Sequence, residues 1–99
     1  MSNEQEVDES DNCVFIGKKP TMAYVFAVQT QAQTHSIIKI LARGRSISQA
    51  ADVSQIALNR FLQGWKMETI NLTTEEKQTT QETNHTDRVS VIEIILKKQ

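Results

Sequence analysis

The chain has 99 residues, enough for a single domain with a modest hydrophobic core. With 38% hydrophobic and 23% charged residues its composition is typical of a soluble protein, and no apolar run approaches the roughly 18 residues of a membrane-spanning helix. The single cysteine excludes an intrachain disulfide and fits a reducing cytoplasm.

The charged residues are unevenly distributed along the chain. Residues 1–12 hold five acidic side chains and no basic one, and we expect them to form an acidic, disordered tail. Residues 13–99 carry 7 acidic and 11 basic side chains, a net charge of +4, and we expect them to form the folded domain. A binding partner would therefore meet a mildly basic domain, although the whole chain has a net charge of −1.

The first half of the chain predicts a strand, a helix and a second strand. The apolar run 13–17 ends in a glycine and is typical of a short buried strand. Pro20 stands at the start of a predicted helix over 20–33, which is apolar on almost every side and is therefore expected to be buried on two sides. The β-branched residues of this segment leave a strand open as an alternative. Residues 36–43 predict the next strand.

A second helix is predicted from residue 46 onwards. Ser46 and Gln49 fit a capping box, in which their side chains satisfy backbone donors at the start of the helix, and Gly64 ends it. Polar residues lie on one side of this helix, and apolar residues cover about half of its circumference. An apolar arc this wide exceeds what a small sheet covers, which predicts a partner subunit. The arc consists of Ile47, Ala50, Ala51, Val53, Ala57, Leu58, Phe61 and Leu62.

The last third of the chain predicts a hairpin of two long strands, 65–74 and 87–98, joined by a polar linker over 75–86. The second strand is apolar on both faces, so we expect it to lie at the centre of the sheet or at an interface. The predicted order of elements is β-α-β-α-β-β.

This order brings two basic loops to one edge of the sheet. A strand–helix–strand crossover makes the first two strands parallel, so both strand-to-helix loops leave the same edge. The first loop carries Lys18 and Lys19, and the second carries Arg43 and Arg45 on either side of Gly44. Four cations, two helix N-termini and free backbone N–H groups together predict a site for a polyanion such as nucleic acid. The alternative is that these side chains are ordinary solvated surface.

The sequence offers no recognisable catalytic or cofactor-binding arrangement. Neither pair of cations has the spacing of a nucleotide-binding P-loop. His35 and His85 are far apart and have no metal-ligand spacing to Cys13, and the carboxylates form no acid–base set. We therefore predict no enzymatic activity, no metal and no cofactor. Tyr24 and Trp65 could stack on bases, but a buried position is the preferred interpretation for both.

Four segments closely resemble the Alba family of small archaeal chromatin proteins. They are VFIGKKPTMAYV, IKILARGRSISQAADV, NRFL and RVSVIEIILKK, and they follow family order and spacing from residue 13 to 98. The resemblance implies an α+β fold built as a two-layer sandwich, with a four-stranded mixed sheet, two helices on one face and an extended hairpin arm. It also implies a homodimer that binds double-stranded DNA with little sequence preference, condenses it, and is associated with the chromosome in the cytoplasm.

The resemblance further implies roles for individual residues. Lys18 corresponds to the lysine that is acetylated in the family, which implies an acetylase and a deacetylase as partners. Phe61 corresponds to an aromatic residue at the contact between dimers on DNA, although it could instead belong to the core. The residues expected to bind nucleic acid are Lys18, Lys19, Arg43, Gly44, Arg45, Lys77 and Arg88.

The acidic residues of the arm depart from the strongly basic family members. The strongly basic members often carry basic residues in the arm. This arm instead holds Glu75, Glu76, Glu82 and Asp87, with Lys77 among them and Arg88 at the base. Proteins of the Alba family also bind RNA, and related eukaryotic chains serve in ribonuclease P and MRP complexes. An RNA-binding protein or ribonucleoprotein subunit is therefore the alternative function.

Overall fold

The computed structural model describes residues 12–80 and 85–99, with the backbone alone for residues 77–80 and 85–87. The tail expected over residues 1–12 lies outside the described residues, except for Asn12. The predicted order of strands and helices is confirmed. The elements are β1 (Cys13–Phe15), α1 (Thr21–Gln31), β2 (Ile37–Arg43), the 3-10 turn η3 (Gly44–Ser46), α2 (Ile47–Ile56), the π-helical turn η4 (Ala57–Phe61), β3 (Trp65–Thr80) and β4 (His85–Lys98).

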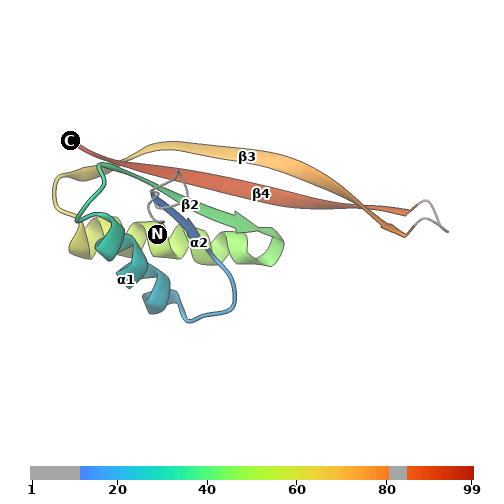
Figure 1. Cartoon of the computed structure of the whole chain (residues 1–99), viewed down its shortest axis with the longest axis horizontal. Helices are drawn as coiled ribbons and strands as arrows, with labels where there is room; N and C mark the ends of the chain where they lie inside the picture. Colours follow the sequence, from blue (N-terminus) through green and yellow to red (C-terminus); the bar gives the residue numbers. More distant parts are fainter. Residues whose placement is uncertain (1–11, 81–84) are drawn as a thin grey trace, which may run out of the picture.

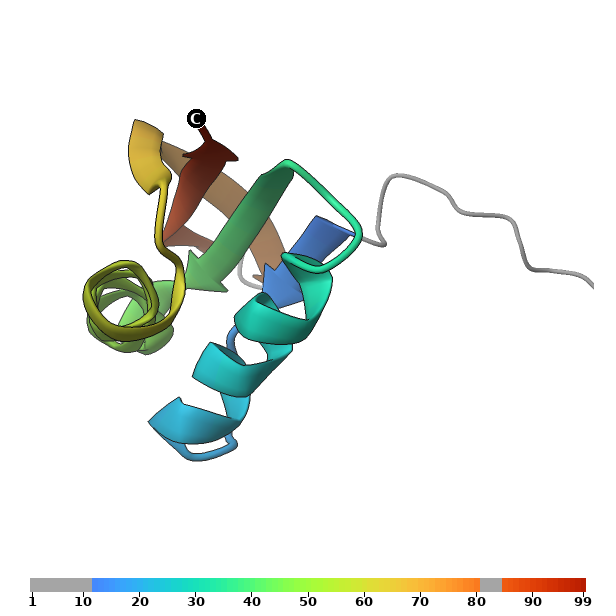
Figure 2. The ribbon, with the colours of Figure 1, turned by 90° about the vertical axis from the view of Figure 1, so that its left-hand side faces the viewer.

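The four strands form one mixed sheet in the order β1-β2-β4-β3. β1 runs parallel to β2, whereas β4 is antiparallel to both of its neighbours, β2 and β3. Both helices cover the same face of the sheet, so the fold has two layers (Figure 2). The predicted α+β class and the central position of the last strand are confirmed.

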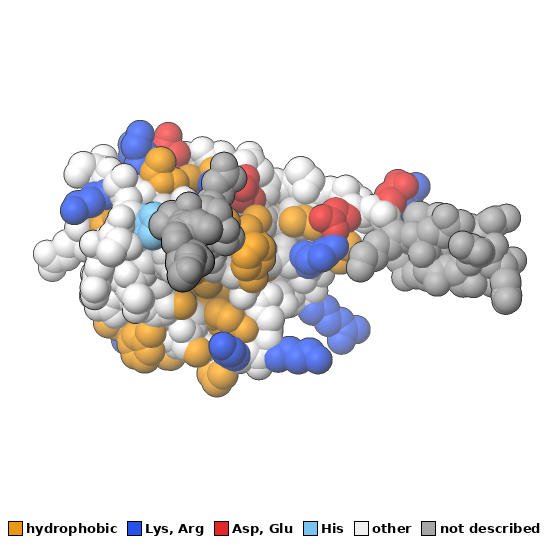
Figure 3. All heavy atoms as spheres, viewed as in Figure 1, with side chains coloured by type: hydrophobic (Ala, Val, Ile, Leu, Met, Phe, Trp, Pro, Cys, Tyr) orange, Lys and Arg blue, Asp and Glu red, His pale blue; other side chains and the backbone are white. Residues whose placement is uncertain are grey.

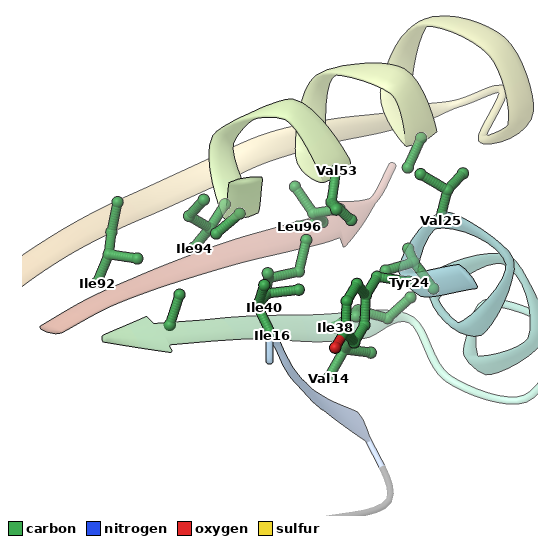
Figure 4. Close-up of a cluster of buried hydrophobic side chains, with 14 of the residues drawn as sticks. Val14, Ile16, Tyr24, Val25, Ile38, Ile40, Val53, Ile92, Ile94 and Leu96 are labelled. Atoms are coloured by element: carbon green, nitrogen blue, oxygen red, sulfur yellow. The ribbon is translucent and has the colours of Figure 1, made fainter. Parts of the chain in front are cut away.

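The core lies between the two helices and the two central strands. Alternate residues of β2 and β4 point toward the helices, because successive side chains of a strand face opposite sides of a sheet. Ile38, Ile40, Ile94 and Leu96 are almost fully buried in this way, under side chains of α1 and α2 such as Val53 (Figure 4). This face of the two central strands therefore forms the contribution of the sheet to the core.

The hairpin arm contains more strand than the sequence predicted. β3 continues to Thr80 and β4 begins at His85, so most of the polar segment 75–86 is paired strand. The predicted end of the first strand at 74 and start of the second at 87 were wrong, whereas the start at Trp65 and the end at Lys98 are confirmed. The arm projects well beyond the helices (Figure 1). The ladder places Glu76 opposite Arg88, and opposite charges in such a pair stabilise a hairpin that has no core beneath it.

Helix α1 is buried on one side only. Tyr24, Val25 and Val28 face the core, whereas Phe26 is 52% exposed and Met22 is also exposed. The expectation of burial on two sides is therefore wrong for a single chain, because the sheet supplies only one covering layer. The alternative of a strand over this segment is also wrong.

The predicted capping box at α2 is not formed. Ser46 is the N-cap residue, but it has a helical conformation and its side chain makes no capping hydrogen bond, because the turn η3 already leads into the helix. Gly64, with φ of 81°, follows the end of this helical segment as predicted. Across the described residues, no helix is both long enough and apolar enough to cross a membrane.

Candidate functional site

The two strand-to-helix loops lie at one edge of the sheet, as the crossover predicts. We call this edge the loop edge; it comprises residues 16–20, between β1 and α1, and residues 43–46, from the last residue of β2 to the start of α2. Helix α2 contacts the first loop directly, because the Gln49 side-chain amide donates to the Lys19 carbonyl oxygen at 2.9 Å and to Oγ1 of Thr21, the first residue of α1, at 3.3 Å. The glutamine predicted to cap its own helix instead connects α2 to the first loop.

Tyr24 holds the first loop in place. Its hydroxyl oxygen accepts hydrogen bonds from the backbone N–H groups of Gly17, at 2.8 Å, and Lys19, at 2.9 Å. The residue is 7% exposed, so the ring belongs to the core and the predicted buried position is confirmed. Lys18 and Lys19 are exposed on the loop that this hydroxyl fixes.

Gly44 shapes the second loop. Its φ of 54° lies in the left-handed region, which side chains other than glycine adopt with strain. A Cβ atom there would also approach Val89 Cγ2 of β4 to 3.2 Å. The glycine thus permits a tight turn against the base of the arm, and it leaves Arg43 and Arg45 exposed on either side.

The electrostatics of the loop edge favour anions. Neither α1 nor α2 has an acidic residue in its first turn or a side-chain cap, so nothing there offsets the partial positive charge of the helix N-terminus. Lys and Arg side chains gather beside the base of the arm (Figure 3). In the first loop, the backbone N–H groups of Gly17 and Lys19 are already bonded to the Tyr24 hydroxyl oxygen. The attraction for anions therefore comes from the Lys and Arg side chains of the loop edge and from the N-termini of α1 and α2.

The arm supplies carboxylates to two of the predicted cations. Arg43 forms an ion pair with Glu75, and Arg88 Nε lies 3.2 Å from Glu76 Oε2. Among the residues whose side chains are described, Lys18, Lys19 and Arg45 form no salt bridge. The loop edge thus has three cations without a described acidic partner and one that is already paired.

The predicted arm residues do not all join the loop edge. The register puts Arg43 opposite Val91, on the face of the sheet that has no helices, whereas Arg88 shares the helix-covered face of β4 with Ile92. The side chain of Lys77 lies outside the described part of the chain, so only its backbone place in β3 is known. Arg43 and Arg88 therefore present their charges on opposite faces of the sheet.

Trp65, Phe61 and His35 contact neighbouring parts of the same chain, and the side chain of His85 lies outside the described part of the chain. Trp65 and Phe61 are half-buried and pack against the core, and the Phe61 ring meets the exposed Phe26 edge to face with centroids 6.1 Å apart. His35 Nδ1 lies 3.2 Å from the Gln31 carbonyl oxygen at the end of α1. Within residues 12–76 and 88–99, no three His, Cys, Asp or Glu side chains are grouped to hold a metal ion.

Sequence reasoning missed the roles of Gln49, Glu75 and the Tyr24 hydroxyl. Gln49 was assigned to a capping box because its spacing from Ser46 suits one. Glu75 lies 32 residues from Arg43, and no local pattern connects the two. Only the order of the strands could have revealed that pair.

Comparison with known proteins places these features in a family context. A family model described as Alba matches residues 12–74. The DNA/RNA-binding protein Alba 1 of Archaeoglobus fulgidus is 44% identical over 91 residues, covering 91% of this chain and 99% of that protein. The DNA/RNA-binding protein Alba of Picrophilus torridus is 42% identical over 88 residues, covering 87% of this chain and 94% of that protein.

Two solved structures share the fold. The structure of Alba from Thermoplasma volcanium is 44% identical, with a TM-score of 0.78 over 88% of this chain and 100% of that one. An Alba protein of Trypanosoma brucei is 20% identical, with a TM-score of 0.69 over 92% of this chain and 72% of that one, and shows likeness of fold alone.

Proposed function

The chain belongs to the Alba family, and from this premise we propose that it is a non-enzymatic, architectural nucleic-acid-binding protein associated with the chromosome in the cytoplasm. Relatives that share over two fifths of its residues are named DNA/RNA-binding proteins. The observation that carries the proposal is the loop edge. There, exposed Lys18, Lys19 and Arg45 precede two helices whose first turns contain no acidic residue.

Double-stranded DNA is the proposed main ligand, bound chiefly through its phosphates. Lysine offers a point charge and arginine a planar fork, and both suit phosphate oxygens. Contacts to phosphate carry no base information, so binding has little sequence preference and can coat and condense long DNA. Within the loop edge, Gly44 allows the tight backbone turn between Arg43 and Arg45. Outside it, Lys77 and Arg88 on the arm are proposed as further contacts.

The proposed active form is a homodimer. Among the residues whose side chains the structure describes, six large apolar side chains are exposed, and a partner could cover such apolar surface. A second copy of the chain would cover part of this surface. The apolar arc of α2 contributes little to it, because Ala50, Val53, Ala57 and Leu62 are buried within the single chain. The exposed side chains are Phe15, Met22, Phe26, Ile37, Ile70 and Leu72.

The salt dependence of binding tests the proposal. Four loop cations per chain limit the slope of log K against log salt to about −7 for a dimer. We expect a smaller magnitude, because Glu75 already neutralises Arg43. Titrating unrelated duplexes of equal length over a salt series should give similar affinities and similar slopes. A slope near zero, or strong discrimination between the duplexes, would contradict binding through phosphates.

Contacts between dimers on DNA are proposed to use Phe61, together with the neighbouring Phe26. Phe61→Ala is expected to reduce cooperative coating of long DNA while affinity for a short, single-site duplex changes by less than about twofold, because the ring lies outside the loop edge. Some loss of stability should accompany it, since the ring also packs against the core. Gel shifts on short and long duplexes measure the two effects.

Phe61→Leu is the companion variant, because it keeps an apolar side chain against the core. If both variants keep the fold but coat long DNA less cooperatively than the parent, Phe61 acts on the surface in contacts between dimers. If Phe61→Ala unfolds and Phe61→Leu coats long DNA like the parent, Phe61 serves the core.

RNA is the second candidate ligand, either for free binding or within a ribonucleoprotein of the ribonuclease P or MRP kind. The observation that favours it is the pairing of Arg43 and Arg88 with arm carboxylates, which lowers the positive charge available to a long, regular duplex. Parallel titrations of duplex DNA and structured RNA over the same salt series distinguish the candidates. Tighter binding to RNA at every salt concentration would make RNA the main ligand.

A further inference from the structure

We propose that Glu75 competes with phosphate for the Arg43 guanidinium and so sets the affinity of the loop edge, an inference that rests on the proposed function. The sequence places an acidic residue in the arm, but only the structure shows that its carboxylate reaches a cation of the loop edge. The other arm pair, Glu76 with Arg88, joins directly opposed residues within the hairpin.

The strand register explains how the two residues meet. Arg43 is the last residue of β2, and Glu75 lies in β3, with β4 between the two strands. Arg43 is opposite Val91 and Glu75 is opposite Val89, and these two valines share one face of β4. Both charged side chains therefore lie on the helix-free face, and the guanidinium reaches across β4 to the carboxylate.

The surroundings of the pair strengthen it while leaving it accessible. Arg43 and Glu75 border a hollow of about 380 Å³ whose lining includes Phe15, Leu41 and Val91. The two charged side chains are 51% and 48% exposed. Apolar neighbours reduce the screening of the pair by water, and the exposed half of each side chain allows a phosphate group to approach.

A phosphate that binds Arg43 must displace Glu75 or share the guanidinium with it. Both ligands use the same N–H donors, since carboxylate and phosphate oxygens fit the same planar fork. Ion pairs at half-exposed positions stabilise a protein only weakly, so displacement is possible and its effect is limited to about fivefold in affinity per chain. The carboxylate also repels phosphates bound nearby. Glu75 therefore weakens binding without abolishing it.

Glu75→Gln tests the proposal with Glu68→Gln as its matched control. Both changes remove one carboxylate from an exposed position of β3, but Glu68 lies near the other end of the strand, beside Lys66, Lys97 and Lys98. We expect Glu75→Gln to tighten duplex binding by about two- to fivefold per chain over Glu68→Gln, with a salt slope steeper by about one unit per chain. Arg43→Gln should then cost more affinity in the Glu75→Gln background than in the parent.

Several outcomes would overturn the proposal. Equal tightening by both variants would mean that net charge alone matters, and weaker binding by Glu75→Gln would mean that the carboxylate orients Arg43 for binding. If the parent binds nucleic acid and Glu75→Gln binds identically, the competition is absent while the proposed function stands. If neither the parent nor a folded variant binds duplex DNA or RNA at low salt, the proposed function itself is wrong.

Discussion

Lys18→Gln is expected to weaken binding to duplex DNA by roughly 10- to 100-fold per homodimer at about 0.1 M salt, because two phosphate contacts are lost at once. The salt slope should fall by about one unit for each lysine that contacts phosphate in the parent. Thermal stability should hold or rise slightly. A cation before a helix N-terminus opposes the helix dipole by a few tenths of a kcal/mol, and the first turn of α1 contains no acidic residue.

A functional lysine is identified by opposite effects of removing its charge: affinity for nucleic acid falls, whereas thermal stability holds or rises. Lys97→Gln is the matched control, because it removes the same charge from an exposed position near the far end of β4. It should change affinity much less than Lys18→Gln. If Lys18→Gln binds both duplex DNA and RNA like the parent at low salt, Lys18 is ordinary surface and the proposed site is wrong.

Acetylation of Lys18 should reproduce the effect of Lys18→Gln, since both remove the charge and keep a polar side chain. On this proposal, an acetylase and a deacetylase would adjust the affinity of the protein without altering its fold. A protein acetylated at Lys18 alone can be compared with the parent in the same salt series. Equal affinities would exclude Lys18 acetylation as a regulator of binding.

Tyr24→Phe is expected to lower the free energy of unfolding by about 1–2 kcal/mol and to weaken nucleic-acid binding several-fold, because two backbone N–H groups lose their acceptor. The loop is exposed, so water replaces part of what is lost. Denaturant unfolding measures the stability. Amide exchange at Gly17 and Lys19, followed by NMR, reports directly on the loop and should become faster.

The phenylalanine ring preserves the buried apolar contacts of Tyr24, so the variant isolates the hydroxyl. Val28→Ala is a useful comparison, since Val28 is fully buried in the same helix and makes no contact with the loop through a polar group. It should lower stability without selectively speeding exchange at Gly17 and Lys19. Unchanged exchange and binding in Tyr24→Phe would show that other contacts hold the loop.

The sequence by itself determined the order of the elements and the position of the loop edge. The largely apolar segments 36–43 and 87–98 predicted two strands, and apolar residues on both faces of the last strand predicted its central place. The crossover rule then required the first two strands to be parallel, which brings Lys18, Lys19 and Arg45 to one edge. These conclusions follow from local periodicity and chain connectivity alone.

The tertiary structure alone decided how the site is held and how its charge is offset. The Tyr24 hydroxyl bonds the first loop, Gln49 of α2 bonds the same loop, and Glu75 of β3 pairs with Arg43 of β2, so the last two contacts join separate elements. Each depends on which strands are neighbours and in what register, and hydrophobic patterns do not specify where a polar side chain finds its partner. The hairpin arm itself was predicted, but the pairing of its polar residues beyond residue 74 has the same origin, because these residues form strand through cross-strand pairing rather than burial.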